Sequence, residues 1–165
     1  MSKKTLLTLY EYNYWATDKI LTQVRRLDEK EFLTETACNM GCVRDTLVHL
    51  LAAEWIWRLR MQEQTFPAAL LRPDDFPTLE AIETFWETEK HQMWGFLGGL
   101  DKDDLQQVVT YRTTSGKEMA NVLGHVLHHV VLHGMQHRAE LAAMLTAFGY
   151  SPGDIDFIVY LRDHG

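Results

Sequence analysis

The chain has 165 residues and a formal net charge of −7 at pH 7. This length fits one domain that can bury a core without disulfides or a structural metal, so we expect a single domain over residues 1–165. Hydrophobic residues make up 46% and charged residues 24%, a composition that argues against disorder. An acidic chain without a lysine and arginine cluster is repelled by phosphate backbones, which excludes nucleic acid as an expected partner.

The N-terminal segment and the hydropathy of the chain predict a cytoplasmic protein. Residues 1–11 lack the apolar stretch and small-residue cleavage site of a signal peptide. No run of about 18 apolar residues occurs, so we expect neither a membrane span nor a membrane partner. Cys38 and Cys42 are then expected to be reduced thiols rather than a disulfide, with a C-x-x-x-C metal pair as the alternative.

The first half of the chain predicts two long helices. Over residues 4–27, apolar side chains recur at three- and four-residue steps along one face. The aromatic residues Tyr14 and Trp15 on this helix are expected to pack in the core. Residues 43–62 are apolar around so much of the helix that we expect deep burial or contact with a partner subunit, hence a homodimer.

The second half predicts two more helices joined by long connections. Residues 66–77 contain three of the four prolines and predict an irregular crossover. Thr78 is the expected N-cap of a third helix that ends near Gly98 and Gly99. Residues 101–116 are β-branched and polar, which predicts an extended or hairpin-like connector.

The start and end of the fourth helix are predicted from its capping residues. Ser115 and Glu118 have capping-box spacing, so we expect this helix to begin there. It should end near Phe148, with Gly149 as its left-handed terminator. A tail over residues 156–162 is expected to pack back onto the domain. Four long helices with two lengthy connections predict an all-α fold, a four-helix bundle.

Histidines are concentrated in the fourth predicted helix. Five of the eight fall within residues 122–138; they are His125, His128, His129, His133 and His137. Residues four apart on a helix are separated by about 40° around the axis and about 6 Å along it. His133 and His137 therefore share a face with the spacing that lets two imidazoles bind one cation. The alternative is a pair of hydrogen-bonded core histidines.

A third ligand has to come from another element, because zinc- or nickel-type sites use three or four ligands. His49 is the histidine of the second predicted helix and lies between Val48 and Ala52 on its apolar face. An imidazole buried there needs a hydrogen-bond partner or a metal. His129 is displaced around its helix from the pair, and we expect it to orient a ligand or its water. Arg138 points about 100° away from the pair, which leaves a structural ion pair and substrate binding as alternatives.

Residues 129–140, HVVLHGMQHRAE, resemble the motif H-V-V-N-H-x-x-x-H-R-G-Q of the DinB/YfiT-like metal-dependent proteins. Residues 43–50 are similar to the segment around that family's first histidine, residues 12–16 to its Y-N-x-W-A segment, and residues 149–157 to its tail. The sequence departs from the pattern at Leu132, where asparagine is common, at Ala139 and Glu140, which replace Gly-Gln, and at Cys42, where a capping serine is usual.

The resemblance implies an up-down-down-up four-helix bundle, often dimeric, that binds one divalent metal, nickel or zinc, on His49, His133 and His137. Characterised relatives include thiol-dependent S-transferases and isomerases that use low-molecular-weight thiols. We therefore expect an enzyme that activates a thiol or water for a small-molecule substrate, with a metal-dependent hydrolase as the alternative reaction. A non-catalytic metal-binding dimer of the stress response and a bundle with purely structural histidines are the other hypotheses.

Overall fold

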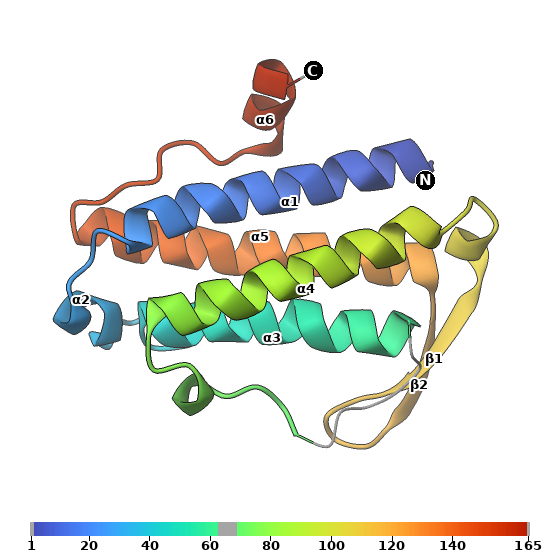
Figure 1. The fold of residues 1–165 in the computed structure, drawn as a ribbon, viewed down its shortest axis with the longest axis horizontal. Helices are drawn as coiled ribbons and strands as arrows, with labels where there is room; N and C mark the ends of the chain where they lie inside the picture. Colours follow the sequence, from blue (N-terminus) through green and yellow to red (C-terminus); the bar gives the residue numbers. More distant parts are fainter. Residues whose placement is uncertain (1, 63–68, 165) are drawn as a thin grey trace.

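The computed structural model describes residues 2–62 and 69–164, and this part of the chain is mostly helical with one small sheet (Figure 1). The helices are α1 (Lys3–Val24), α2 (Glu29–Leu33), α3 (Val43–Gln62), α4 (Leu79–Gly99), α5 (Leu123–Ala147) and α6 (Phe157–His164). Two short 3-10 helices are η1 (Pro73–Asp75) and η2 (Asp104–Gln106), and the antiparallel strands are β1 (Val108–Arg112) and β2 (Glu118–Val122). None of the described helices is long and apolar enough to cross a membrane.

The first predicted helix ends earlier than expected because a second, unpredicted helix follows it. α1 stops at Val24, and α2 begins after Asp28, whose backbone is extended. The Asp28 carboxylate accepts a hydrogen bond from the backbone N–H of Glu31, and the Glu31 carboxylate accepts one from the backbone N–H of Asp28. An N-cap has non-helical backbone angles, so this capping box separates the two helices.

The next two helices have the predicted bounds. α3 covers the 43–62 segment, and α4 begins after Thr78, whose hydroxyl accepts a hydrogen bond from the backbone N–H of Ala81 at 3.3 Å. α4 ends at Gly99, as expected. The described part of the crossover, residues 69–77, is irregular apart from η1, while residues 66–68 lie outside the described residues.

The predicted start of the fourth helix is wrong. The segment after Gly116 forms β2, which pairs with β1 in a hairpin, and α5 begins only at Leu123. Ser115 bonds the hydroxyl of Thr113 instead of capping a helix. Gly116 has a φ of 82°, a left-handed conformation that glycine adopts at the turn without strain. The hairpin prediction for the connector is therefore confirmed, and the capping box of Ser115 and Glu118 is not formed.

The end of α5 has the predicted glycine terminator. Gly149 has a φ of 87°, its N–H donates to the carbonyl of Thr146, and the N–H of Tyr150 donates to the carbonyl of Leu145. These two bonds are those of a Schellman motif, which satisfies carbonyls that the helix end leaves free. The chain then returns along α1, where α6 buries Tyr160 against Tyr12. The prediction that the tail packs back is confirmed.

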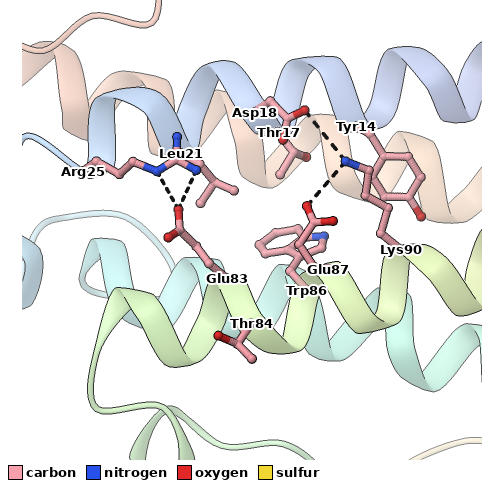
Figure 2. A pocket seen from close by; sticks show the side chains of 10 residues that line it. All are labelled: Tyr14, Thr17, Asp18, Leu21, Arg25, Glu83, Thr84, Trp86, Glu87 and Lys90. Atoms are coloured by element: carbon pink, nitrogen blue, oxygen red, sulfur yellow. Dashed lines mark hydrogen bonds and ion pairs between the residues drawn. The ribbon is translucent and has the colours of Figure 1, made fainter.

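The four long helices α1, α3, α4 and α5 lie side by side along the long axis of the molecule (Figure 1). α5 packs against both α1 and α3, and α3 also packs against α4. Between α1 and α4, side chains line a polar cleft that ion pairs cross, from Arg25 to Glu83 at 2.8 Å and from Lys90 to Asp18 at 4.0 Å (Figure 2). Because α5 packs against α3, histidines on these two helices can meet.

Candidate metal centre

Three histidines from two helices converge on one point. His133 and His137 lie one turn apart on α5, with ring centroids separated by 4.5 Å. The ring of His49 on α3 lies 4.5 Å from that of His137 and 5.2 Å from that of His133. One nitrogen from each ring lies within 4.8 Å of the other two, so the three side chains could hold a metal ion.

The local sequence explains this convergence. The i, i+4 spacing brings His133 and His137 to one face of α5. On α3, His49 follows the buried residues Leu47 and Val48, which pack in the core and bring this stretch of the helix against α5. His137 is buried, whereas His49 and His133 are half-buried. The site is therefore anchored in the core and reaches the surface on one side.

The surroundings of His49 and His133 disfavour the charged forms of these two imidazoles. Burial, together with the neighbouring rings of His137, His49 and His129, lowers the pKa of His133 to about 4. Burial is also the main cause that lowers the pKa of His49, followed by the nearby His137. Neutral imidazole is the form that binds a metal, so the donor set fits a divalent transition metal at neutral pH.

Glu140 orients one of the three rings. Its Oε2 lies 2.8 Å from Nδ1 of His137, one turn along α5. When Nδ1–H donates to this carboxylate, Nε2 is left with its lone pair free for a metal. Carboxylate partners of this kind fix the tautomer of ligating histidines and raise their basicity. The i, i+3 spacing of His137 and Glu140 is a signal for this pair in the sequence, where Glu140 otherwise stands out only as a departure from the family motif.

A cavity of about 400 Å³ opens beside the histidines. His49 and His133 form part of its wall, and most of the other lining residues are apolar. Those residues are Met40, Val48, Ala52, Ala53, Ile56, Trp57, Leu70, Leu71 and Pro73, together with Asp45 and Thr114. This volume lies within the usual range for small-molecule sites. His49 and His133 thus face a space that can admit a ligand.

Comparison with known proteins identifies the family of this chain. The model of the DinB family matches residues 1–164. The chain belongs to the DinB family. Protein DinB of Bacillus subtilis (strain 168) is 25% identical to it over 159 residues, which cover 93% of this chain and 91% of that protein. The similarity to this family therefore covers nearly the whole chain.

The other histidines of this DinB-family chain lie outside the three-histidine cluster. His125 is exposed and His128 is half-buried. His129 is exposed as well, with its ring 5.2 Å from that of Trp57 and 5.7 Å from that of His133. Ring contact with His133 is compatible with an orienting role, which stays a prediction. Cys38 and Cys42 are free thiols, as expected.

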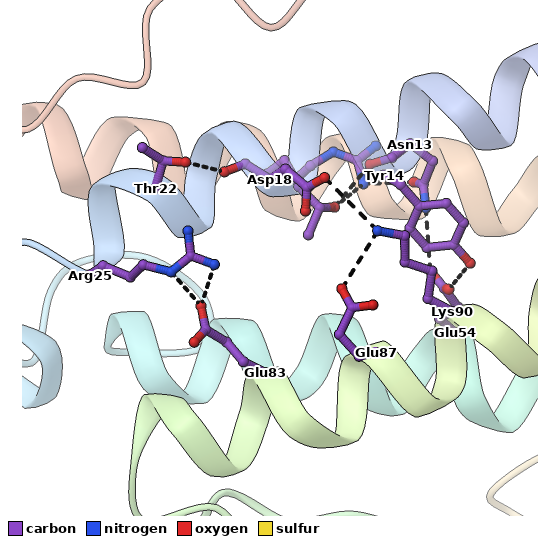
Figure 3. A network of polar contacts seen from close by, with 11 residues as sticks. Asn13, Tyr14, Asp18, Thr22, Arg25, Glu54, Glu83, Glu87 and Lys90 are labelled. Atoms are coloured by element: carbon purple, nitrogen blue, oxygen red, sulfur yellow. Dashed lines mark hydrogen bonds and ion pairs between the residues drawn. The ribbon is translucent and has the colours of Figure 1, made fainter.

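A buried polar network beside the centre was not predicted. The Glu54 carboxylate on α3 accepts hydrogen bonds from the Tyr14 hydroxyl at 2.5 Å and the Asn13 amide at 3.3 Å (Figure 3). Nη1 of Arg138 donates to the amide oxygen of Asn13 at 2.6 Å. Asn13 therefore links the Arg138 guanidinium on α5 to the Glu54 carboxylate on α3. Of the two roles left open for Arg138, the structure supports the structural one.

Glu54 makes the stability of the fold depend on pH. Burial is the main cause that raises the pKa of Glu54 from its usual 4.5 to about 7. A raised carboxyl pKa stabilises the folded state fully below pH 4.5, and this contribution is lost as pH rises through 7. Relative to Glu54→Gln, the wild-type protein should lose on the order of 3 kcal/mol of unfolding free energy between pH 4.5 and 8. Urea unfolding of both proteins at several pH values measures this, and parallel profiles would contradict it.

Proposed function

We propose that this protein is a metal-dependent enzyme that activates a thiol or a water molecule at His49, His133 and His137, in the manner of a thiol S-transferase. The proposal includes the up-down-down-up four-helix bundle and one bound nickel or zinc ion, as implied by the family. The observation that carries it is the convergence of three imidazoles beside an open cavity. Three protein ligands leave further metal positions for a substrate, as catalytic sites require.

The residues of the chain would bind and orient the metal ion, and apolar side chains would exclude water beside it. His133 and His137 would bind the ion from α5 and His49 from α3, while Glu140, 2.8 Å from Nδ1 of His137, would hold that ring in one tautomer. A divalent ion held by three neutral imidazoles keeps its charge and lowers the pKa of a coordinated thiol or water. The apolar cavity wall excludes bulk water beside that position.

The reaction is tested on the metal-loaded protein with thiols and electrophiles. We expect it to accelerate transfer of a thiol to an alkyl or aryl halide above the rate with the metal-free protein. Acceleration of ester cleavage without thiol transfer would instead support the hydrolase alternative. If neither reaction is accelerated over a panel of thiols and esters, the enzyme proposal is wrong.

A non-catalytic role is the second candidate, because the histidines come from two different helices. A metal that joined α3 to α5 would stabilise the fold, by about 2.7 kcal/mol at a free concentration of 100 times Kd. In that case metal loading would raise the melting temperature, and no thiol or ester would react faster. The two candidates therefore differ in the activity assay and not in the melting experiment.

The contact between Glu140 and His137 predicts a measurable share of metal affinity. Glu140→Ala is expected to weaken zinc binding by about 10- to 100-fold, because the ring loses the carboxylate that orients it. Glu140→Gln should recover part of the loss, since its amide oxygen still accepts from Nδ1–H. Competition with a chromophoric chelator measures both constants, and Gln136→Ala, exposed on the same helix, serves as control. Equal affinities of Glu140→Ala and the wild type would contradict the role.

We also propose a homodimer, although the apolar surface of α3 that suggested it from the sequence is now largely accounted for within the chain. The wide apolar surface of α3 is covered within the chain by α5, α4, α2 and β1. Large apolar side chains still exposed among the described residues include Leu132, Val108 and Ile158. We expect light scattering at micromolar concentration to give twice the chain mass of 19.2 kDa. A mass equal to one chain would exclude the dimer under those conditions.

A further inference from the structure

The wall of the cavity beside the three histidines is mostly apolar. Nine of its lining side chains are Met, Val, Ala, Ile, Trp, Leu or Pro, while the polar ones are His49, His133, Asp45 and Thr114. No lysine or arginine lines it among the described residues. The segment 63–68, which the structure does not describe, contains neither residue type in its sequence.

Two cations close to this wall, Arg44 and Arg60, are engaged by other groups. Nε of Arg44 contacts the Asp45 carboxylate at 2.8 Å. Asp45, the one acidic lining residue in the described part of the chain, therefore holds that charge. The guanidinium of Arg60 stacks on the Trp57 ring at 4.6 Å and on Tyr111 at 5.3 Å, and it does not line the cavity. A carboxylate in the cavity would therefore lose hydration without gaining a cationic partner from the wall, which is costly.

Trp57 gives the cavity an aromatic side. Its ring lies edge-on to Tyr111 at 5.0 Å and to His129 at 5.2 Å, so neighbours on β1 and α5 hold it in place. Ala52, Ala53 and Ile56 lie on the same helix as Trp57, next to His49. Small side chains close to the histidines leave room for a ligand body, and the apolar wall gains free energy when that body displaces water.

We infer that the substrate bound here is an uncharged thiol with an apolar body, rather than a thiol that carries carboxylates. This inference rests on the proposed function and names its substrate class. The thiol sulfur would lie at the histidine cluster, and the body would lie along Ala52, Ile56 and Trp57. Glutathione and other carboxylate-bearing thiols would then be poor ligands, because the described wall offers no cation to their carboxylates.

A matched pair of thiols tests the inference by binding rather than by turnover. Cobalt(II)-loaded protein is titrated with benzyl mercaptan and with para-(mercaptomethyl)benzoate, which differ by one carboxylate, and the visible spectrum of the cobalt reports binding. We expect the carboxylate to weaken binding by about tenfold or more, and glutathione to bind more weakly than benzyl mercaptan. Equal or tighter binding of the carboxylate analogue overturns the substrate class and leaves the proposed function standing. If no thiol perturbs the cobalt spectrum, thiol activation itself fails and the inference fails with it.

A second test places a positive charge in the cavity wall and measures the preference between the two thiols. Ala52→Lys adds a cation to a half-buried lining position on α3, and it should reduce the preference for benzyl mercaptan over its carboxylate analogue by about tenfold or more. Ala143→Lys adds the same charge on an exposed position of α5 and should leave the preference unchanged. If the two variants alter the preference equally, net charge and not the cavity wall governs selection, and the inference is wrong.

Discussion

His133→Ala is expected to abolish stoichiometric metal binding. Protein purified without a metal-affinity tag or a chelator should carry near one equivalent of a divalent transition metal, and the variant near none. The reason is geometric: His133 is one of three imidazoles whose nitrogens lie within 4.8 Å of one another. Two remaining ligands are fewer than known zinc sites use, so the loss should exceed the 10- to 100-fold that removing an orienting partner costs.

A matched histidine variant separates the ligand role from a general loss of imidazole. His125→Ala removes an exposed histidine from the same helix and should retain metal at the wild-type level. Elemental analysis gives the stoichiometry, and competition titration gives the change in Kd. Stoichiometric metal in His133→Ala would show that the cluster is not the binding site. Loss of metal in both variants would point to indirect effects on α5.

Helical periodicity alone predicted the part of the site that lies on one helix. His133 and His137 share a face of α5 because residues four apart always do so in a helix. Placing His49 beside them required knowledge of which helices pack together, and the periodicity of α3 contains no such information. The family resemblance supplied that part, and the contact between α3 and α5 brings His49 to the pair.

One capping signal was predicted wrongly and another was missed, each for a physical reason. Ser115 and Glu118 have capping-box spacing, yet backbone pairing with β1 satisfies residues 118–122 as a strand, so the helix starts at Leu123. The capping box of Asp28 and Glu31 is formed, and it initiates a five-residue helix too short to show apolar periodicity. Side-chain spacing indicates a possible cap, while the competing backbone partners decide whether it forms.

The polar network around Asn13 could not be predicted from the sequence for a different reason. Its members come from three helices, and no pattern along one helix links Asn13 on α1, Glu54 on α3 and Arg138 on α5. Gly134 contributes by being small, because a Cβ there would lie 2.8 Å from Nη1 of Arg138 and 2.9 Å from Oδ1 of Asn13. Such networks depend on tertiary contacts that spacing rules do not describe.

The largest loss of stability is expected from Arg138→Met, which removes the buried cation of this network. Arg138 is 1% exposed and Glu54 is 3% exposed, and the nearby guanidinium lowers the pKa of the Glu54 carboxyl against the larger effect of burial. Arg138 reaches Glu54 through Asn13, so its removal leaves the ionised Glu54 carboxylate without a nearby positive charge. Breaking a buried charge pairing costs about 3–5 kcal/mol. Urea unfolding at pH 8 should show this loss. Arg162→Met, at an exposed position of α6, should change stability by less than about 0.5 kcal/mol.

The dependence of that loss on pH and on Glu54 identifies its cause. At pH 5 the Glu54 carboxyl is protonated in the folded protein, since its pKa is about 7, so the missing cation should matter less than at pH 8. The double variant Arg138→Met with Glu54→Gln should recover much of the stability at pH 8, because a neutral amide needs no countercharge. A loss equal at both pH values and unaffected by Glu54→Gln would assign the effect of Arg138 to packing against Tyr12 rather than to charge. The double-variant cycle therefore measures how strongly α5 and α3 are coupled electrostatically beside the three histidines.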